Sequence, residues 1–525
     1  MFDHAKSDYL NLVESSFKSE NITISSINSI DDQVDKCDKH ANSTNKIIAE
    51  NKDKTNFDLC IVGAGACGLA ATISAIETGC TSICLIDRES KIGGILKQCI
   101  HSGFGLEHFK EELTGPEYVH REVLKLYNLL VQNNNVNLEI LNGALATKLS
   151  KTDNIFSVEV AHKTGYRTIK SKAVILSSGS RERGFGTLNI AGDRPSGIYT
   201  AGTAQAFINL QGVVPGKNAV VLGSGDIGLI MTRRMILSGM NVKAVYELMP
   251  NPSGLRRNIV QCLEDYDIPL YLSHTVTKTH GSGRLEAVTI QEVDENLNPI
   301  DGTEEIVGCD TLVLSVGLIP ECELALECGA DFNPATKSVK VGADFQTKVD
   351  GLFVCGNALH IHDLVDYVSK EGSASGINAA KFIKGDEDLQ KFEIKNNHKQ
   401  EIEESNEANV EMLTCTVCPN GCTLKVTLNS AGKVEDVTGN KCPNGYKYAK
   451  SEFSCPTRNI SALMNSKFSL EPISVKTSSP IPKDKIKDVA NEILDSPNID
   501  SAKVGDVLIK DVCGTNSDIV ATKNS

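Results

Sequence analysis

A glycine motif near the start of the chain constrains its fold more than any other feature, because the elements on both sides of it can be inferred. The apolar run 59–62 has the length of a buried strand, and the run 69–78 has the composition of a helix. The motif between them is Gly-x-Gly-x-x-Gly, with its glycines at Gly63, Gly65 and Gly68. A second apolar run, 81–86, ends in Asp87. This order predicts a parallel α/β unit.

The chemistry that such a unit supports is dinucleotide binding. Gly63 permits a tight turn, Gly65 lets the backbone approach a pyrophosphate, and Gly68 lets the helix pack on the strand. The start of the helix offers unpaired N–H groups and the positive end of its dipole to phosphates. Asp87 can accept hydrogen bonds from a ribose. A glycine motif alone would be weak evidence for dinucleotide binding. Here the strand, the helix, the second strand and its terminal acid are all present.

The same pattern occurs a second time. A predicted strand, 218–222, is followed by glycines at Gly223, Gly225 and Gly228, a helix-like run to about residue 238, and a strand, 242–246, that ends in Glu247. Alternating segments follow each copy and lead to a strand that ends in glycine, Gly179 or Gly317. This internal duplication predicts an α/β fold with two Rossmann-like domains, and transfer of electrons between two bound dinucleotides.

Glu247 bears on the choice of nucleotide at the second site. A carboxylate at the end of the second strand hydrogen-bonds a ribose 2′-OH and repels a 2′-phosphate, so NAD(H) is favoured over NADP(H). Arg256 and Arg257 follow closely and could bind such a phosphate instead.

A third glycine turn lies near residue 356. The apolar run 352–355 leads to Gly356 and Asn357, and a helix is expected over 369–383. The start of a helix near this turn could face a flavin pyrimidine ring, where its dipole would stabilise the negative charge of the reduced ring. His360 and His362 follow the turn, either as metal ligands or, as we favour, as polar contacts.

Residues 57–385 resemble the two-dinucleotide-binding flavoproteins, the pyridine nucleotide-disulfide oxidoreductases. The more specific stretches are 93–105, 111–118, 247–258 and 355–366. They resemble the α subunits of dye-linked proline dehydrogenase, sarcosine oxidase and hydrogen cyanide synthase, and more closely the flavoprotein found beside anaerobic glycerol-3-phosphate dehydrogenase. The resemblance implies NAD(P)H at the second glycine motif and FAD at the first. The implied FAD residues are Gly63, Gly65, Gly68, Asp87, Gly94, Gly179, Gly356 and Asn357. Members of the superfamily often have Asp where this chain has Asn357.

This family implies a discontinuous FAD-binding domain with the NAD(P)-binding domain inserted in it. The predicted parts are a disordered or variable extension 1–56, FAD-binding segments 57–200 and 318–385, the NAD(P)-binding domain 201–317, a charged linker 386–410, and a small Cys-rich α+β domain 411–525.

Cys99 is the candidate catalytic thiol, since it lies in the glycine-rich loop after the first unit. A dithiol reductase needs a second cysteine two or four residues away, and this loop has none. Cys80 and Cys84 have a suitable spacing, but Cys84 falls in a predicted core strand, as buried cysteines often do. We therefore expect no disulfide-reductase chemistry. A lone redox role for Cys99 stays open beside the favoured packing role.

The C-terminal segment carries a second predicted centre. Cys415, Cys418, Cys422 and Cys442 are spaced C-x2-C-x3-C-x19-C and lie next to Pro and Gly. Zinc sites commonly use two paired knuckles, whereas three close cysteines and one distant one are typical of a [4Fe–4S] cluster. The layout is similar to the cluster domain of molybdopterin oxidoreductases, and 411–525 resembles a domain of unknown function found with such flavoproteins. We favour the cluster over zinc.

Composition excludes some functions. The net charge of −14 argues against nucleic-acid binding, and no apolar run is long enough to cross a bilayer. The first residues lack the features of a secretory signal, and seventeen cysteines suit a reducing compartment, so we expect a cytoplasmic protein.

The predicted function is a FAD-dependent NAD(P)H oxidoreductase that passes electrons between nicotinamide, FAD and a C-terminal cluster or a partner dehydrogenase. Two alternatives stay open. One is a subunit of a FAD-dependent amine or amino-acid dehydrogenase. The other is a non-catalytic assembly subunit with structural FAD and zinc.

Overall fold

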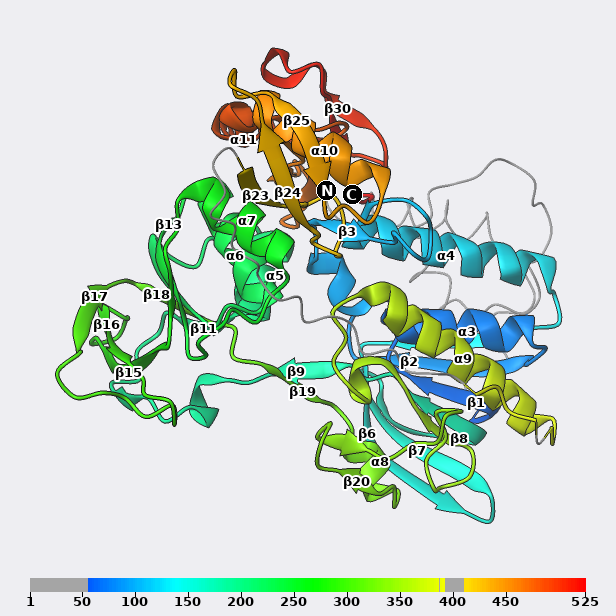
Figure 1. The fold of residues 1–525 in the computed structure, drawn as a ribbon. Helices are drawn as coiled ribbons and strands as arrows, with labels where there is room; N and C mark the ends of the chain where they lie inside the picture. Colours follow the sequence, from blue (N-terminus) through cyan, green and yellow to red (C-terminus); the bar gives the residue numbers. More distant parts are fainter. Residues whose placement is uncertain (1–54, 387, 392–409) are drawn as a thin grey trace.

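The computed structural model describes residues 55–386, 388–391 and 410–525 (Figure 1). Nearly all of the predicted extension and most of the predicted linker lie outside these ranges. The described chain forms a first lobe (55–182 and 318–391), a second lobe (183–317) and a tail domain (410–525). In Figure 1 the tail domain lies across the top of both lobes.

The first lobe is built on a seven-stranded sheet with the order β5-β2-β1-β8-β7-β6, to which β22 adds beside β8. Its strands are β1 (Asn56–Val62), β2 (Ser82–Asp87), β5 (Asn137–Asn142), β6 (Ala144–Thr152), β7 (Ile155–His162), β8 (Gly165–Leu176) and β22 (Leu352–Val354). The strand β1 pairs in parallel with both β2 and β8. Leu59, Ile61 and Ile175 are completely buried, as expected for parallel strands covered on both faces.

The first lobe also contains the long helices α3 (Ala66–Glu77), α4 (Gly115–Gln132) and α9 (Val365–Ile383) and the short helix α8 (Glu323–Glu327). Helices α3 and α9 lie side by side (Figure 1). Their close approach requires Gly372 and Gly376, because a Cβ atom at these positions would lie 2.2 Å from the carbonyl oxygens of Cys67 and Ala71. Helix α4 begins with a capping box formed by Thr114 and Glu117.

The alternating region 138–172 differs in part from the expected meander. Strands β6, β7 and β8 form it, with antiparallel pairing. Strand β5 instead pairs in parallel with β2 and extends the central sheet. Alternation identifies strands but not their partners, so the sequence could not separate these two roles.

The second lobe contains a five-stranded parallel sheet with the order β11-β18-β12-β13-β14. Its strands are β11 (Ile198–Thr200), β12 (Asn218–Leu222), β13 (Asn241–Glu247), β14 (Leu270–Leu272) and β18 (Thr311–Leu314). A smaller sheet contains β10 (Ala191–Gly192), β15 (His274–His280), β16 (Ala287–Glu292) and β17 (Glu305–Gly308). The helices are α5 (Ala201–Gln211), α6 (Asp226–Leu237) and α7 (Arg256–Cys262).

The chain crosses between the lobes through two short strands. Strands β9 (Ser180–Glu182) and β19 (Leu318–Pro320) pair in antiparallel fashion. The return to the first lobe begins with β19, at residue 318. On the outward side, β10 and β11 already pair with strands of the second lobe, and the boundaries predicted at residues 200 and 318 stay predictions.

The tail domain combines three sheets, one of them the two-stranded pair β26 (Thr457–Arg458) and β29 (Ile481–Pro482), with two α-helices. Its other strands are β23 (Val410–Thr414), β24 (Thr423–Leu428), β25 (Val434–Thr438), β27 (Ser461–Met464), β28 (Ile473–Thr477), β30 (Val507–Ile509) and β31 (Ile519–Ala521). Helix α11 (Ile486–Asp495) buries one apolar face. Helix α10 (Pro443–Ser454) was not predicted from the sequence. Its Cys-Pro-Asn-Gly start was interpreted as a turn, although proline also favours the first position of a helix.

The tail domain is tied to both lobes by ion pairs. The buried Arg458 guanidinium donates to Asp265 Oδ1 of the second lobe at 2.9 Å and to Glu452 Oε2 of the tail at 2.8 Å. Lys476 Nζ lies 2.8 Å from Glu117 Oε1 of the first lobe. The three parts therefore have a defined relative placement.

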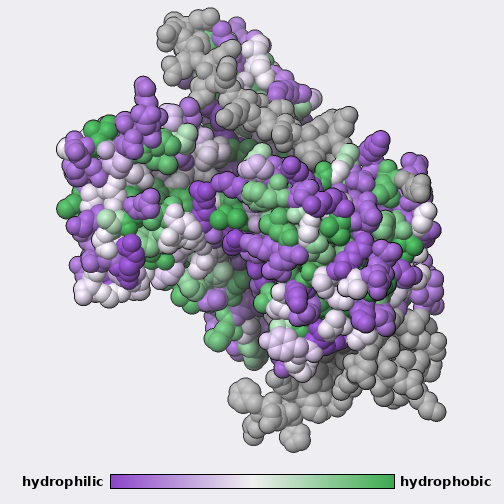
Figure 2. Space-filling view, turned by 90° about the horizontal axis from the view of Figure 1, so that it is seen from below, coloured by the Kyte–Doolittle hydropathy of each residue, from purple (hydrophilic) through white to green (hydrophobic). Residues whose placement is uncertain are grey.

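Hydrophobic residues are scattered among hydrophilic ones on the face shown in Figure 2. In the part of the chain that the structure describes, no helix has both the length and the apolar character needed to cross a bilayer.

Candidate functional site

The first glycine loop, between β1 and α3, accepts only glycine at two of its positions. Gly63 has φ +102°, and a Cβ there would lie 2.4 Å from the carbonyl oxygen of Ser177. A Cβ on Gly68 would lie 1.8 Å from the carbonyl oxygen of Gly63. The tight turn and the close helix packing predicted for these glycines are both present.

The start of α3 is open to an anionic group. Its N-cap residue, Gly65, has no side chain to accept from the first N–H groups, and the first turn holds no acidic residue. Gly94 has φ +56°, and a Cβ on it would lie 2.9 Å from the Cα of Gly65. Two glycine-containing backbone segments thus meet at a helix N-terminus. Such a site, without side chains in the way, fits the pyrophosphate of a dinucleotide.

Asp87, at the end of β2, binds the glycine loop itself. Its Oδ2 accepts from the Ala64 N–H at 2.6 Å, and its Oδ1 accepts from the Glu89 N–H at 2.8 Å. Burial raises the pKa of this carboxyl. Both oxygens keep a further lone pair, so the predicted bond to a ribose can add to these contacts.

The second glycine loop, between β12 and α6, repeats the glycine turn and the acid at the end of the next strand, but the first turn of α6 holds Asp226. Gly223 has φ +99°, and a Cβ there would lie 2.1 Å from the Ser315 carbonyl oxygen. The Gly228 N–H donates to Ser315 Oγ at 3.1 Å, and Gly225 is the N-cap of α6. Glu247, at the end of β13, accepts from the main-chain N–H of Ser224. Both loops thus fit a dinucleotide.

The two arginines that could have favoured a 2′-phosphate differ in their surroundings. Arg256 Nε donates to Thr414 Oγ1 of the tail domain at 3.1 Å. Arg257 is buried against the first lobe, where a Cβ on Gly103 would lie 2.3 Å from its Nη2. The choice between NAD(H) and NADP(H) stays a prediction.

The glycine turns at Gly179 and Gly356 follow two paired strands, β8 and β22. Gly179 and Gly356 both have positive φ, +77° and +64°. The Gly356 N–H donates to Glu371 Oε2 at 2.9 Å, and Asn357 Oδ1 accepts from the His362 N–H at 3.1 Å. Helix α9 begins at Val365, four residues before the predicted start at residue 369.

His360 and His362 converge on a buried carboxylate that the sequence did not reveal. Their Nε2 atoms lie 3.3 Å and 3.2 Å from Glu371 Oε1. The three possible ligand atoms lie within 4.8 Å of one another. Burial lowers the pKa of His360, while the charge of Glu371 opposes this effect. The group could hold a divalent metal ion. The alternative, which the sequence favoured, is that the two histidines serve as polar contacts.

Cys99 lies in the predicted loop, with Sγ 3.3 Å from the Ile95 carbonyl oxygen and 3.8 Å from Gln205 Oε1. Burial raises its pKa to about 12. Since the thiolate is the reactive form, this environment favours the packing role over a redox role.

Four further cysteines of the first lobe lie in its core. Cys60 and Cys84 are paired across β1 and β2, and Cys67 Sγ lies 3.4 Å from Cys355 Sγ. All four are buried free thiols. Cys80 is buried as well, so the spacing of Cys80 and Cys84 reflects packing.

The tail cysteines come from two segments of the tail domain, and they are not among the groups of three or more possible metal ligands within 4.8 Å that the described residues form. Cys415, Cys418 and Cys422 lie between β23 and β24, and Cys442 is the N-cap of α10. The Cys415 N–H donates to the Cys422 carbonyl oxygen at 2.9 Å. Burial, and with it the charges of the other three thiols, raises the pKa of Cys415. The choice between cluster and zinc stays a prediction.

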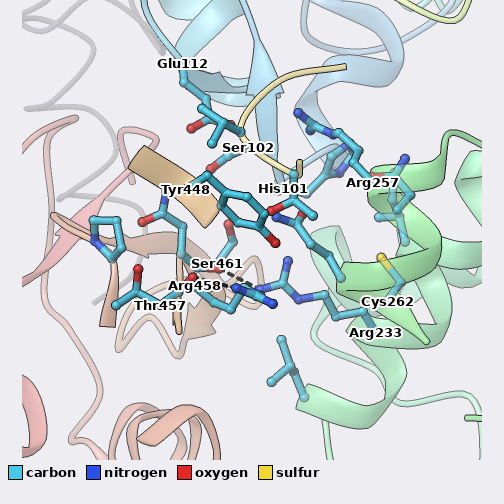
Figure 3. Close-up of a pocket in the computed structure, with 18 of the residues that line it drawn as sticks. His101, Ser102, Glu112, Arg233, Arg257, Cys262, Tyr448, Thr457, Arg458 and Ser461 are labelled. Carbon is cyan, nitrogen blue, oxygen red and sulfur yellow. Dashed lines mark hydrogen bonds between the residues drawn. The ribbon is translucent and has the colours of Figure 1, made fainter. Parts of the chain in front are cut away.

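A partly open cavity of about 560 Å³ lies where the three parts meet. Figure 3 shows Arg233 and Arg257 on helices of the second lobe and Arg458 and Tyr448 on the tail domain around it. The first lobe adds His101 from the segment after Cys99. Sequence reasoning missed this site, because its residues are far apart in the chain. The adjacent pairs Arg233-Arg234 and Arg256-Arg257 were its only signal.

Comparison with known proteins agrees with this architecture. Residues 57–380 match the family described as pyridine nucleotide-disulphide oxidoreductase. Residues 443–523 match a family described as a protein of unknown function (DUF1667).

Two relatives match the lobes. One subunit of the opine oxidase of Agrobacterium tumefaciens is 21% identical over 324 residues, which are 58% of this chain and 62% of the relative. The alpha subunit of the sarcosine oxidase of Rhizobium meliloti is 24% identical over 315 residues, which are 59% of this chain and 29% of the relative. The chain thus spans less than two thirds of the length of these relatives.

Among solved structures, thioredoxin reductase of T. acidophilum is similar, with a TM-score of 0.51 and 21% sequence identity over 63% of this chain and 99% of that one. This likeness shows the two-lobed α/β fold. Because the family match covers well over half of the chain, the protein belongs to the pyridine nucleotide-disulphide oxidoreductase family.

Proposed function

We propose that this chain passes electrons between NADH at the second glycine loop, FAD at the first, and either a cluster on the tail cysteines or a partner redox protein. Its family makes it a FAD- and pyridine nucleotide-dependent oxidoreductase. FAD supplies a carrier that accepts two electrons and can release them singly. The observation that carries the proposal is the repetition of one loop construction in two lobes of one chain.

The residues of the chain bind and orient the two nucleotides. At each loop a glycine-rich turn and a helix N-terminus hold phosphates. In each lobe an acid at the end of the strand after the glycine loop accepts a hydrogen bond from the loop. Asp87 accepts from the main-chain N–H of Ala64, and Glu247 accepts from that of Ser224. The preference for NADH over NADPH rests on Glu247, whose charge opposes a 2′-phosphate, and on Arg256, which donates to Thr414 of the tail domain.

The tail cysteines support a metal centre in the proposal. A [4Fe–4S] cluster needs four thiolates, and the spacing of three close cysteines and a remote fourth suits it better than zinc. Iron, sulfide and zinc analysis of the purified full chain tests this part. Iron and sulfide in equal amounts support the cluster, and stoichiometric zinc without iron contradicts it.

Electron transfer is tested by adding NADH to the flavin-loaded protein without oxygen. Loss of the flavin absorbance is expected, with NADPH acting much more slowly. If neither nucleotide reduces the flavin, the alternative of an assembly subunit with structural FAD and zinc replaces the proposal.

A cytoplasmic location and a partner subunit belong to the same proposal. The named relatives are subunits of oxidases, which supports a multisubunit context. The similarity to these oxidase subunits also favours a second candidate function, a subunit of a FAD-dependent amine or amino-acid dehydrogenase. Reduction of the flavin by an amine or an amino acid in the absence of NADH would establish that candidate. The cysteines of the described ranges are free thiols, which suits a reducing compartment.

A further inference from the structure

The cavity between the two lobes and the tail domain contains more positive charge than its surroundings compensate. Four arginines line it: Arg233, Arg234, Arg257 and Arg458. The one carboxylate among the described lining residues is Glu112, whose pKa is raised by burial although Arg257 and Lys476 oppose this effect.

Only one of these arginines is fully paired within the described chain. Arg458 binds both Asp265 and Glu452. Asp265 also takes Lys483, whose Nζ lies 2.8 Å away, so it has little left for a further cation. Arg233 donates to the Asn459 carbonyl oxygen at 2.6 Å, which satisfies an N–H but brings no negative charge.

Arg257 and Arg234 have donors without partners. Both side chains are more than nine-tenths buried. Nε and Nη1 of Arg257 and Nε of Arg234 have no hydrogen-bond partner among the described residues. Burial, and then the adjacent Arg233, lower the pKa of Arg234 to about 10. Buried, unpaired cations are costly, and a guanidinium edge matches the geometry of a carboxylate or phosphate.

We propose that this cavity is a binding site for a small organic anion that carries a phosphate or two carboxylates. Arg257 and Arg234 bind the anionic group, and Arg233 adds to the attraction. The volume of about 560 Å³ lies in the range of small-molecule sites. His101, whose Nδ1 is enclosed and has no partner in the described ranges, offers a further hydrogen bond. No residue of the two glycine motifs is among the described lining residues, although the lining residue Asn258 donates to Asp226 of the second motif at 2.8 Å. The inference goes beyond the proposed function.

The test is isothermal titration calorimetry of the full flavin-loaded chain with pyrophosphate and, separately, malonate, at an ionic strength held constant with sodium chloride. Saturable binding of at least one probe is expected. Arg257→Gln and Arg234→Gln should each weaken it at least tenfold, and Arg257→Lys should weaken it less. Arg121→Gln, at an exposed ion pair with Glu111, is the matched control and should leave binding unchanged. The stronger probe identifies the phosphate or the dicarboxylate class.

Three results would overturn the site. The first is that neither probe binds, and the second is that Arg121→Gln weakens binding as much as Arg257→Gln does. The third is competition: if NADH displaces the probe and Arg257→Gln weakens NADH equally, the arginines belong to the nucleotide site. Failure of NADH to reduce the flavin, with arginine-dependent probe binding intact, would refute the proposed function and leave this inference standing.

Discussion

Glu247 Oε2 lies 2.8 Å from the main-chain nitrogen of Ser224 and 2.5 Å from its hydroxyl oxygen. Ser224 is the second residue of the second glycine loop. The acid that was expected to contact a ribose therefore also holds the loop that would bind the pyrophosphate. One carboxylate couples nucleotide choice to the shape of the loop.

Replacing Glu247 should reduce the discrimination between nucleotides. Glu247→Gln keeps the size of the side chain but removes the charge that opposes a 2′-phosphate. The ratio of kcat/KM for NADH to that for NADPH should fall about tenfold, because charged hydrogen bonds contribute on the order of 1.5–3 kcal/mol. Anaerobic flavin reduction with each nucleotide measures it. An unchanged ratio would show that Glu247 acts on the loop alone.

Asp87 should matter for both stability and flavin retention. Asp87→Ala leaves the buried Ala64 N–H without its acceptor, which costs about 1–3 kcal/mol of unfolding free energy. The variant should also lose FAD during gel filtration. Asp331→Ala, at an exposed ion pair with Lys348, is the control and should retain both properties. Retention of FAD by Asp87→Ala at wild-type level would contradict this role.

The contact between α3 and α9 should not tolerate a methyl group. In Gly376→Ala the new Cβ would lie 2.2 Å from the Ala71 carbonyl oxygen, so the helices must separate. Overpacking of this kind costs about 1–3 kcal/mol or more. Gly186→Ala, where nothing lies within 4 Å of the added Cβ, is the matched control. Urea unfolding of both variants compares them, and equal midpoints would refute the prediction.

His101 should make the protein less stable in acid. Burial, then Arg257 and Arg233, lower its pKa to about 3, whereas an unfolded histidine titrates near about 6.5. Between these two pKa values the unfolded chain binds more protons than the folded chain does. The contribution of neutral His101 to the free energy of unfolding is therefore complete above the unfolded pKa and is lost as pH falls. Since the side chain is only half-buried, we expect a loss of about 1–2 kcal/mol between about pH 7 and about pH 5.

His101→Gln should remove this part of the pH dependence. Urea unfolding of the wild type and the variant at both pH values measures the difference between their slopes. Parallel pH profiles would show that His101 does not contribute.

The tail cysteines should determine the metal content. Cys418→Ser removes one thiolate of the predicted set, and bound iron or zinc should fall to background. Cys455→Ser is the control, because Cys455 is exposed and lies outside the predicted set. Metal analysis of both variants tests the assignment. An equal loss of bound metal in both variants would contradict the predicted set of ligands.

The sequence predicted the elements that are specified locally. Strand β12 occupies residues 218–222, as expected, because an apolar run bounded by a glycine turn fixes both of its ends. The start of α9 was missed, since its N-cap, Leu364, provides no capping side chain to mark it. Helix α10 was missed because Pro443 and Gly445 were interpreted as a turn.

The sites that depend on tertiary structure could not be predicted. Glu371 lies nine residues from His362, and only the path of α9 brings its carboxylate to both histidines. The cavity joins His101, Arg257 and Arg458 from three parts of the chain. No spacing rule connects such residues, because their proximity depends on how the lobes and the tail domain pack.

The ion pairs of the tail domain also have a mechanical consequence. The polypeptide links the lobes through the ribbon of β9 and β19. Arg458 holds Asp265 on one side of that ribbon, and Lys476 holds Glu117 on the other. Any swing of one lobe about the ribbon must therefore break one of these pairs or drag the tail with it. The tail thus restrains the movement of the two lobes relative to each other. Salt, or a charge reversal at Lys476, would weaken this restraint.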